Sequence, residues 1–231
     1  MEYDFKQGEL LLIDKPLDWT SFDVVNKIRY TIKKNCDFEG KMKVGHAGTL
    51  DPLATGLMII CTGKKTKTIQ ELTGLDKVYT GTILLGKTTP SYDLETEFDK
   101  EYPTAHITEE MIHEVADSFV GEQEQIPPVF SAKKIKGKKA YDMARKGEVV
   151  EMKPNMITIH RFKVTAVEMP EVHFEVHCSK GTYIRSLAYD FGKKLESGAC
   201  LTALRRTHVG DFDIDKALTV DDFVQQVAGK K

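Results

Sequence analysis

The stretch "GHAGTLDPLATG" occupies residues 45–56, and the apolar run "LMIIC" follows it at 57–61. A single carboxylate, Asp51, stands in this glycine-rich segment. An aspartate before a proline is common in turns because its side chain accepts backbone hydrogen bonds, and on the residues alone the turn is the favoured interpretation. Glycines on both sides nevertheless allow close approach of a ligand. A buried strand after the loop would also hold the carboxylate rigidly enough to act as nucleophile or base, provided that a cation keeps it ionised.

The length of 231 residues fits one large domain, or one domain with a small appendage, and we predict a single domain over residues 1–231. The formal net charge of −2 neither indicates nor excludes a nucleic-acid partner. Four cysteines lie far apart without a C-x-x-C pair, which favours reduced thiols in a cytoplasmic protein over disulfides or a zinc site. Because no signal sequence and no apolar run of membrane length is evident, we expect no membrane partner.

Hydrophobic periodicity predicts several strands and helices separated by turn residues. The strands are expected at 10–13, 57–61, 78–85, 156–167, 172–178 and 201–209, and the helices at 21–34, 66–72, 109–119, 183–194 and 220–227. The strands at 156–167 and 172–178 are separated only by a short break containing Pro170, which is typical of an antiparallel hairpin. The pattern therefore favours an α+β fold with a mixed or antiparallel central sheet over a doubly wound α/β fold.

The segment "SAKKIKGKKAYDMARK" at 131–146 carries the strongest charge asymmetry, and Lys133, Lys134 and Lys136 lie at its start. Lysine-rich runs are usually solvated loops. The same residues, interleaved with aromatic side chains, also suit a phosphate-gripping arm. From composition alone the two interpretations are about even. Elsewhere Arg205 and Arg206 are expected to add positive charge.

Two other motifs are rejected. "TGKKT" at 62–66 lacks the glycine spacing of a phosphate-binding loop and has a lysine where a serine or threonine should follow. His173 and His177 share a strand face, but without a clear third ligand they do not indicate a metal site. No metal is predicted.

The chain resembles the bacterial tRNA pseudouridine-55 synthases, the TruB family. The stretch at 45–56 is similar to the catalytic-loop motif of that family. Further similar blocks follow in the family's order at 11–25, 77–89, 125–147, 178–192 and 204–212. The resemblance implies the pseudouridine synthase fold, an α+β domain with a long sheet split by a cleft. It also implies conversion of a T-loop uridine of tRNA to pseudouridine, without cofactor or metal.

The resemblance also implies site residues. Asp51 matches the catalytic aspartate, Tyr79 the tyrosine that packs on the target base, and Arg185 the arginine that pairs with the aspartate. His46 matches the histidine that enters the T-loop as the base leaves. Tyr183 and Leu204 match further substrate-contacting positions, and the basic insertion at about 125–150, with Lys133, Lys134 and Lys136, matches an RNA-gripping element.

Several alternatives stay open at this level. Asp51 can attack C1′ of the ribose, attack C6 of the base, or assist departure through a glycal, and the acceptor of the C5 proton is not determined. We expect a monomer without the small C-terminal RNA-binding (PUA-type) domain that many relatives carry. An RNA-folding chaperone, or the same chemistry on a different RNA, are the competing functions.

Overall fold

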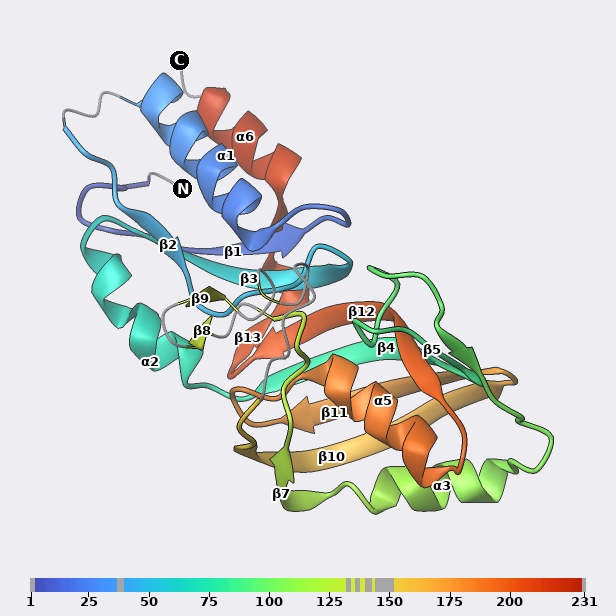
Figure 1. The fold of residues 1–231 in the computed structure, drawn as a ribbon. Helices are drawn as coiled ribbons and strands as arrows, with labels where there is room; N and C mark the ends of the chain where they lie inside the picture. Colours follow the sequence, from blue (N-terminus) through green and yellow to red (C-terminus); the bar gives the residue numbers. More distant parts are fainter. Residues whose placement is uncertain are drawn as a thin grey trace. The chain divides into compact units, whose positions relative to one another are not determined.

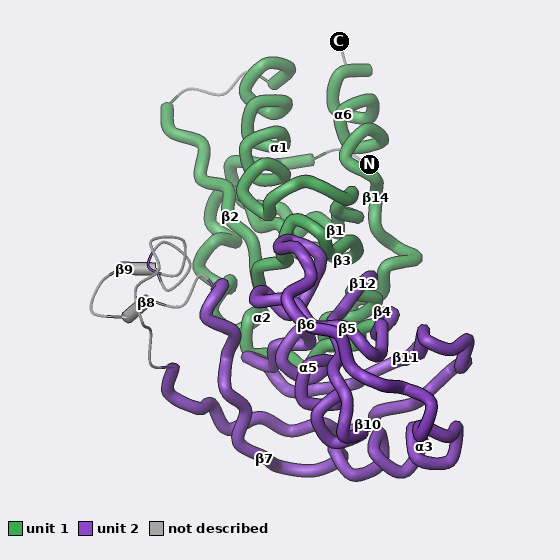
Figure 2. The backbone as a smooth tube through the Cα atoms, turned by 45° about the vertical axis from the view of Figure 1, so that its right-hand side comes forward, with its two compact units in different colours: residues 1–79, 204–231 green, residues 80–203 purple. Residues whose placement is uncertain are grey.

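The computed structural model describes residues 3–36, 40–131 and 152–229, together with 134–135, 138–139 and 143. The chain packs as two compact units, which are coloured separately in Figure 2. The first consists of residues 1–79 and 204–231, and the second of residues 80–203. Strands β4 (Lys77–Leu85) and β12 (Ala199–Val209) each contribute residues to both units. The single catalytic domain over 1–231 stays a prediction, and each unit is described by itself.

The first unit contains a mixed sheet. Its strands lie in the order β14-β1-β3-β12, with β2 added beside β3 and β13 beside β12. The β1–β14 and β3–β12 pairs are parallel, whereas β1 and β3 are antiparallel. The bounds of the strands that lie wholly in this unit are β1 Leu10–Lys15, β2 Val44–His46, β3 Ala54–Thr62, β13 Phe212–Asp213 and β14 Leu218–Thr219.

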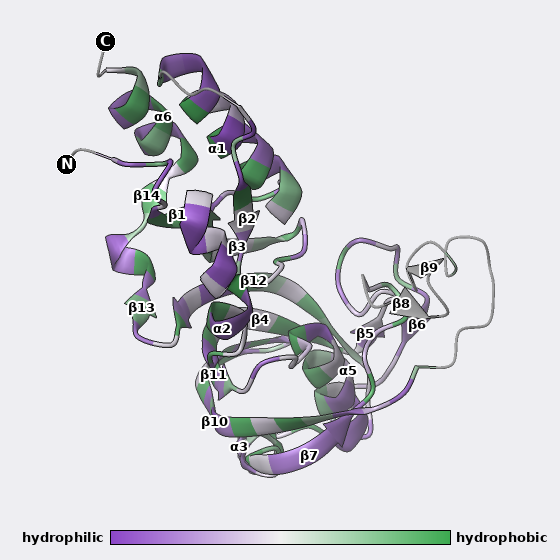
Figure 3. Ribbon diagram, turned by 90° about the vertical axis from the view of Figure 1, so that its left-hand side faces the viewer, coloured by the Kyte–Doolittle hydropathy of each residue, from purple (hydrophilic) through white to green (hydrophobic). Residues whose placement is uncertain are grey.

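Helices α1 (Ser21–Asn35) and α6 (Val220–Ala228) lie side by side against the sheet of this unit (Figure 1). Thr20 caps α1 in a reciprocal arrangement with Asp23, because the Thr20 hydroxyl accepts from the Asp23 N–H while the Asp23 carboxylate accepts from the Thr20 N–H. Both helices are amphipathic, as the alternating hydropathy of their ribbons shows (Figure 3). Their apolar faces are buried, and these residues are Val24, Val25, Ile28, Ile32, Val220, Phe223 and Val227.

The prediction of an α-helix over 66–72 is wrong for its first residues. The chain forms a 3₁₀-helix, η1 (Gly63–Thr68), followed by a single α-helical turn, α2 (Ile69–Thr73). The hydroxyls of Thr66 and Thr68 donate to the carbonyls of Gly63 and Lys65, three residues earlier. Such local side-chain bonds compete with α-helical pairing and explain the tighter turn.

Strand β3 forms the centre of this unit because both of its faces are buried. Leu57, Ile59 and Cys61 pack with Ala47 and other side chains on one face. The alternate residues Met58 and Ile60, which point to the opposite face, are also fully buried. The strand predicted at 57–61 is therefore confirmed, and the glycine-rich loop before it ends on a rigid element.

The second unit contains the strands β12-β4-β11-β10-β7 in that order. β10 (Asn155–Glu168) and β11 (Glu171–Cys178) pair antiparallel, so the predicted hairpin is confirmed. β7 (Gly121–Gln125) pairs antiparallel with β10. The short pairs are β5 (Lys87–Thr88) with β6 (Lys100–Glu101), and β8 (Lys134–Ile135) with β9 (Lys138–Lys139).

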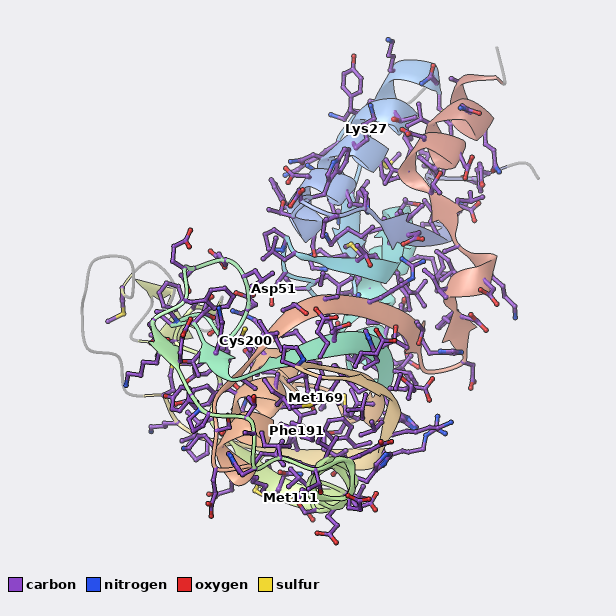
Figure 4. The ribbon with its side chains drawn as sticks, turned by 90° about the vertical axis from the view of Figure 1, so that its right-hand side faces the viewer. Lys27, Asp51, Met111, Met169, Phe191 and Cys200 are labelled. Atoms are coloured by element: carbon purple, nitrogen blue, oxygen red, sulfur yellow. The ribbon has the colours of Figure 1, made fainter. Side chains whose placement is uncertain are left out.

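Helices α3 (Glu109–Asp117) and α5 (Ile184–Lys194) pack on this sheet around an aromatic core. The rings of Phe119, Phe162 and Phe191 lie within 6.3 Å of one another, and Phe174 contacts Phe162 at 5.6 Å. Figure 4 labels Phe191 within this unit. Among the described residues, no helix is both long enough and apolar enough to span a membrane. The α+β class with a mixed sheet agrees with the sequence-based prediction.

Candidate active site

Asp51 lies in the loop between β2 and β3 of the first unit, where Figure 4 labels it. The backbone on its N-terminal side is fixed by Ser21, the first residue of α1. The Ser21 hydroxyl accepts from the Leu50 N–H at 2.8 Å and donates to the Leu50 carbonyl at 3.0 Å. On the other side, the Ala54 N–H donates to the Asp51 carbonyl at 3.1 Å. These bonds hold the loop backbone on both sides of Asp51 and do not involve its carboxylate.

Lys15, the last residue of β1, also anchors this loop. Its ammonium group is fully buried and donates to the carbonyls of Pro16 at 2.9 Å, Trp19 at 2.6 Å and Pro52 at 3.2 Å. Burial lowers the pKa of Lys15 to about 8, and the nearby charge of Asp51 opposes that shift. Sequence reasoning did not single out this residue, although a lysine before a proline at the end of an apolar strand was visible.

Arg206 is the third anchor. Its side chain is only 1% exposed, so the positive charge expected from Arg206 lies inside the first unit. The guanidinium donates through Nε to the Leu57 carbonyl at 2.7 Å and through Nη2 to the Gly48 carbonyl at 3.1 Å. Gly48 has a φ of +97°, a left-handed conformation that glycine adopts without cost. Arg206 therefore ties the loop to the central strand by donating to the buried Leu57 carbonyl and to the Gly48 carbonyl, a bond that is partly buried.

Gly56 allows β3 to approach the backbone of Arg206. A Cβ at position 56 would overlap the Arg206 carbonyl oxygen and lie 2.7 Å from its nitrogen, and the φ of Gly56 is +107°. We expect Gly56→Ala to lower the free energy of unfolding by about 3 kcal/mol, because conformational strain and overpacking add. Gly121→Ala is the matched control, since Gly121 has a φ of +118° and open space around its Cβ position.

Urea unfolding of both variants measures these effects. The control should lose only about 1 kcal/mol, from strain alone. Equal losses in the two variants would mean that the close approach to Arg206 contributes nothing.

His46 ends β2 and is half-buried. Burial lowers the pKa of its imidazole, the positive charge of Arg206 lowers it further, and a hydrogen bond with the Gly48 backbone partly opposes both. Its Nδ1 atom is buried and has no hydrogen-bond partner among the residues that the structure describes. The ring is accordingly neutral at pH 7.

The depressed pKa of His46 predicts a pH dependence. The unfolded chain takes up the proton first as the pH falls below about 6.5. The contribution of His46 to the free energy of unfolding is therefore full above that pH and is lost as the pH falls through the lower folded pKa. Histidine NMR titration should give a midpoint for His46 below that of the same residue in the urea-unfolded protein. A midpoint at or above the unfolded value would contradict the prediction.

Tyr79 and Leu204 are the other predicted site residues of the first unit. Tyr79, in β4, is 8% exposed. Leu204, in β12, is half-buried and lies opposite Ala54 in the parallel register with β3. The Thr55 hydroxyl donates to the Leu204 carbonyl at 3.5 Å. Leu204 is thus aligned with the strand that begins directly after the Asp51 loop.

Arg185 belongs to the second unit and is the second residue of α5. Its side chain is buried, so Arg185 does not form a plain surface ion pair. Its Nη1 donates to the Ser91 carbonyl at 3.2 Å, and its Nε lies 3.6 Å from Oδ2 of Asp93, whose carboxylate is also buried. Sequence reasoning missed Asp93. Its signal was indirect, because an arginine on an apolar helix face needs a buried acidic partner.

Tyr183 precedes α5 and is held by a side-chain amide. The Tyr183 N–H donates to Oε1 of Gln125 at 2.8 Å, and Nε2 of Gln125 donates to the Tyr183 carbonyl at 3.0 Å. Gln125 therefore fixes the backbone of Tyr183 at the end of β7. Of the basic segment, Lys133 and Lys136 lie outside the described residues, and Lys134 is described only as part of β8.

Comparison with known proteins identifies the family. A model of the "TruB family pseudouridylate synthase (N terminal domain)" matches residues 33–184, and one of the "tRNA pseudouridylate synthase B C-terminal domain" matches residues 185–231. The chain belongs to the TruB family of pseudouridylate synthases. The predicted fold and enzyme class, a pseudouridine synthase, are thereby confirmed.

Relatives within the TruB family are similar over nearly their whole length. The tRNA pseudouridine synthase B of Flavobacterium johnsoniae is 54% identical over 97% of this chain and 98% of its own. That of Phocaeicola vulgatus is 57% identical over 95% of this chain and 93% of its own. A solved structure of an H/ACA RNP bound to a substrate RNA containing 2′-deoxyuridine matches with a TM-score of 0.70 and 26% identity. The match covers 98% of this chain but only 57% of that one.

Proposed function

We propose that this protein isomerises the uridine at position 55 in the T-loop of tRNA to pseudouridine, with Asp51 as the reacting carboxylate. Membership of the TruB family and the relatives named tRNA pseudouridine synthase B support the reaction. The observation that supports the role of Asp51 is the anchoring of its loop. Ser21, Lys15 and Arg206 hold the backbone on both sides of the carboxylate without using the carboxylate itself. Such preorganisation is what a reacting group requires.

The chemistry needs a carboxylate but no added reagent. The target base is stacked in a folded loop, so the enzyme must extrude it before reaction. The bond between N1 and C1′ breaks, the uracil rotates, and a bond forms between C5 and C1′; the C5 proton then leaves and N1 takes up a proton. Asp51 attacks C1′, as in a retaining glycosidase, or C6 of the base, or assists departure through a glycal. Because product and substrate are isomers, the reaction balances without an oxidant, a reductant or hydrolysis, and we propose no cofactor or metal.

The remaining site residues receive roles from the family resemblance and from their surroundings. Tyr79 packs on the target base, and Arg185 supplies the positive charge that keeps a carboxylate ionised. The neutral ring of His46 takes the place of the extruded base in the T-loop. Tyr183 and Leu204 contact the substrate RNA. Lys133, Lys134 and Lys136 bind phosphates of the T-arm through the basic segment.

Tritium release from a tRNA transcript labelled at uracil C5 tests the function directly, because isomerisation must expel that hydrogen. We expect release from the unmodified transcript and none above background from a transcript in which only uridine 55 is replaced by cytidine. Release that does not depend on position 55 would indicate another uridine or another RNA. Tight tRNA binding without release would favour an RNA-folding chaperone. The proposal also places a monomer in the cytoplasm, where its tRNA substrate is processed.

A further inference from the structure

Two tyrosines of the second unit form a close stack that the proposed reaction does not use. The ring centroids of Tyr92 and Tyr189 are 4.1 Å apart, and the rings are inclined by only 18°. Tyr92 belongs to the loop between β5 and β6, and Tyr189 to α5. Both side chains are half-buried, and the Lys193 ammonium lies 5.6 Å from the centre of the Tyr189 ring. Parallel aromatic pairs of this kind hold two elements at a fixed separation.

The loop takes an unfavourable conformation at Tyr92. Its φ is +66°, a left-handed conformation that is unusual for a bulky residue and that persists only where the surroundings enforce it. The Tyr92 N–H donates to the Thr89 carbonyl at 3.1 Å, and the Leu201 N–H donates to the Tyr92 carbonyl at 2.9 Å. The hydroxyls of Thr89 and Ser91 both donate to the Asp93 carbonyl. The turn therefore fixes the position of the Asp93 backbone.

The stack joins the same two elements as the Arg185–Asp93 ion pair. Asp93 follows Tyr92 in the loop, and Arg185 precedes Tyr189 by one turn of α5, so the arginine and the tyrosine lie on one side of that helix. Beyond Asp93 the loop is open to solvent at Leu94, Glu95 and Glu97. Within the described residues, the stack is the aromatic contact that holds this loop against α5.

We propose that Tyr92 and Tyr189 are positioning residues, which clamp the loop onto α5 so that Asp93 holds the Arg185 guanidinium in its working orientation. The inference rests on the proposed role of Arg185. The ion pair spans 3.6 Å between Nε and Oδ2, at the long end of direct contact, so a small displacement of the loop separates the charges. A clamp on the residue next to Asp93 prevents that displacement.

The test compares single-turnover tritium release and tRNA binding in variants of the full chain. Tyr92→Gly removes the ring and keeps the left-handed backbone accessible, so we expect release about tenfold slower with an unchanged tRNA dissociation constant. Tyr92→Phe, which keeps the stack, should restore the rate to within about twofold of wild type. Leu94→Gly is the matched control for added loop freedom, since the exposed Leu94 directly follows Asp93, and it should react at the wild-type rate.

A double-mutant cycle separates positioning from general loosening. Asp93→Ala should slow release by at least about a hundredfold, and Tyr92→Gly added to it should cause no further loss, because the stack would act only through Asp93. The inference would be overturned if the rate losses of the two single variants multiplied in the double variant, or if Tyr92→Gly reacted at the wild-type rate. Tyr189→Leu removes the other ring of the stack and keeps a residue that favours the helix. Its rate of tritium release should equal that of Tyr92→Gly. Wild-type rates in both Arg185→Met and Asp93→Ala would instead refute the proposed role of Arg185, and the inference with it.

Discussion

Asp51→Asn is expected to abolish pseudouridine formation while leaving tRNA binding and folding intact. An amide neither attacks carbon nor accepts a proton as a carboxylate does, and loss of such a group typically slows a reaction by about 10⁴-fold or more. The anchors of the loop are bonds to the backbone of Leu50, Pro52 and Gly48, which the substitution does not touch. The free energy of unfolding should therefore change by less than about 0.5 kcal/mol.

Single-turnover tritium release, filter binding of tRNA and urea unfolding together test this expectation. Asp18→Asn is a matched control, because Asp18 is an exposed acid whose N–H donates to the Pro52 carbonyl of the same loop. Asparagine also tolerates the φ of +62° at that position. The control should react at the wild-type rate. Undiminished release by Asp51→Asn would return Asp51 to the role of a turn residue.

Arg206→Met is expected to destabilise the protein about as strongly as Gly56→Ala and also to slow the reaction. The substitution removes the donors to the buried Leu57 carbonyl and to the partly buried Gly48 carbonyl, and leaves both without that partner. An unsatisfied buried acceptor costs about 1–3 kcal/mol, and the relief of desolvating one charge offsets part of the loss. We expect the free energy of unfolding to fall by about 3 kcal/mol. Release should also slow at least tenfold, because the Asp51 loop loses its tie to β3.

The neighbouring Arg205 offers a sharp control for this variant. Its side chain is 41% exposed and forms an ion pair with Asp14 at 2.7 Å. Exposed pairs contribute at most about 1 kcal/mol, so Arg205→Met should unfold at nearly the wild-type urea concentration. If the two methionine variants unfold at the same urea concentration, Arg206 is not an anchor of the loop. Arg206→Lys should be intermediate, because one ammonium group does not reproduce two donors in fixed directions.

Much of the fold followed from local pattern. The apolar residues Val24, Val25, Ile28 and Ile32 carry the helical periodicity of 21–34, and α1 buries those four side chains. The alternation in 172–178 likewise predicted a strand with one buried face, and β11 buries Val172, Phe174, Val176 and Cys178. The helix at 66–72 failed where threonine hydroxyls bonded back to the main chain. Periodicity reports which residues face the core and is less informative about the pitch of a short turn.

The sequence by itself determined the family, the α+β class and the candidate carboxylate. A glycine-rich loop before an apolar strand is a local signal, and five further blocks stand in the family's order. Only the tertiary structure decided what anchors the backbone of the loop that carries this carboxylate, and which acid pairs with Arg185. Arg206 reaches Gly48 across 158 positions, Lys15 reaches Pro52 across 37, and Asp93 faces Arg185 from a distant loop. Buried charges need partners, and chain folding rather than sequence spacing decides which carbonyl or carboxylate becomes that partner.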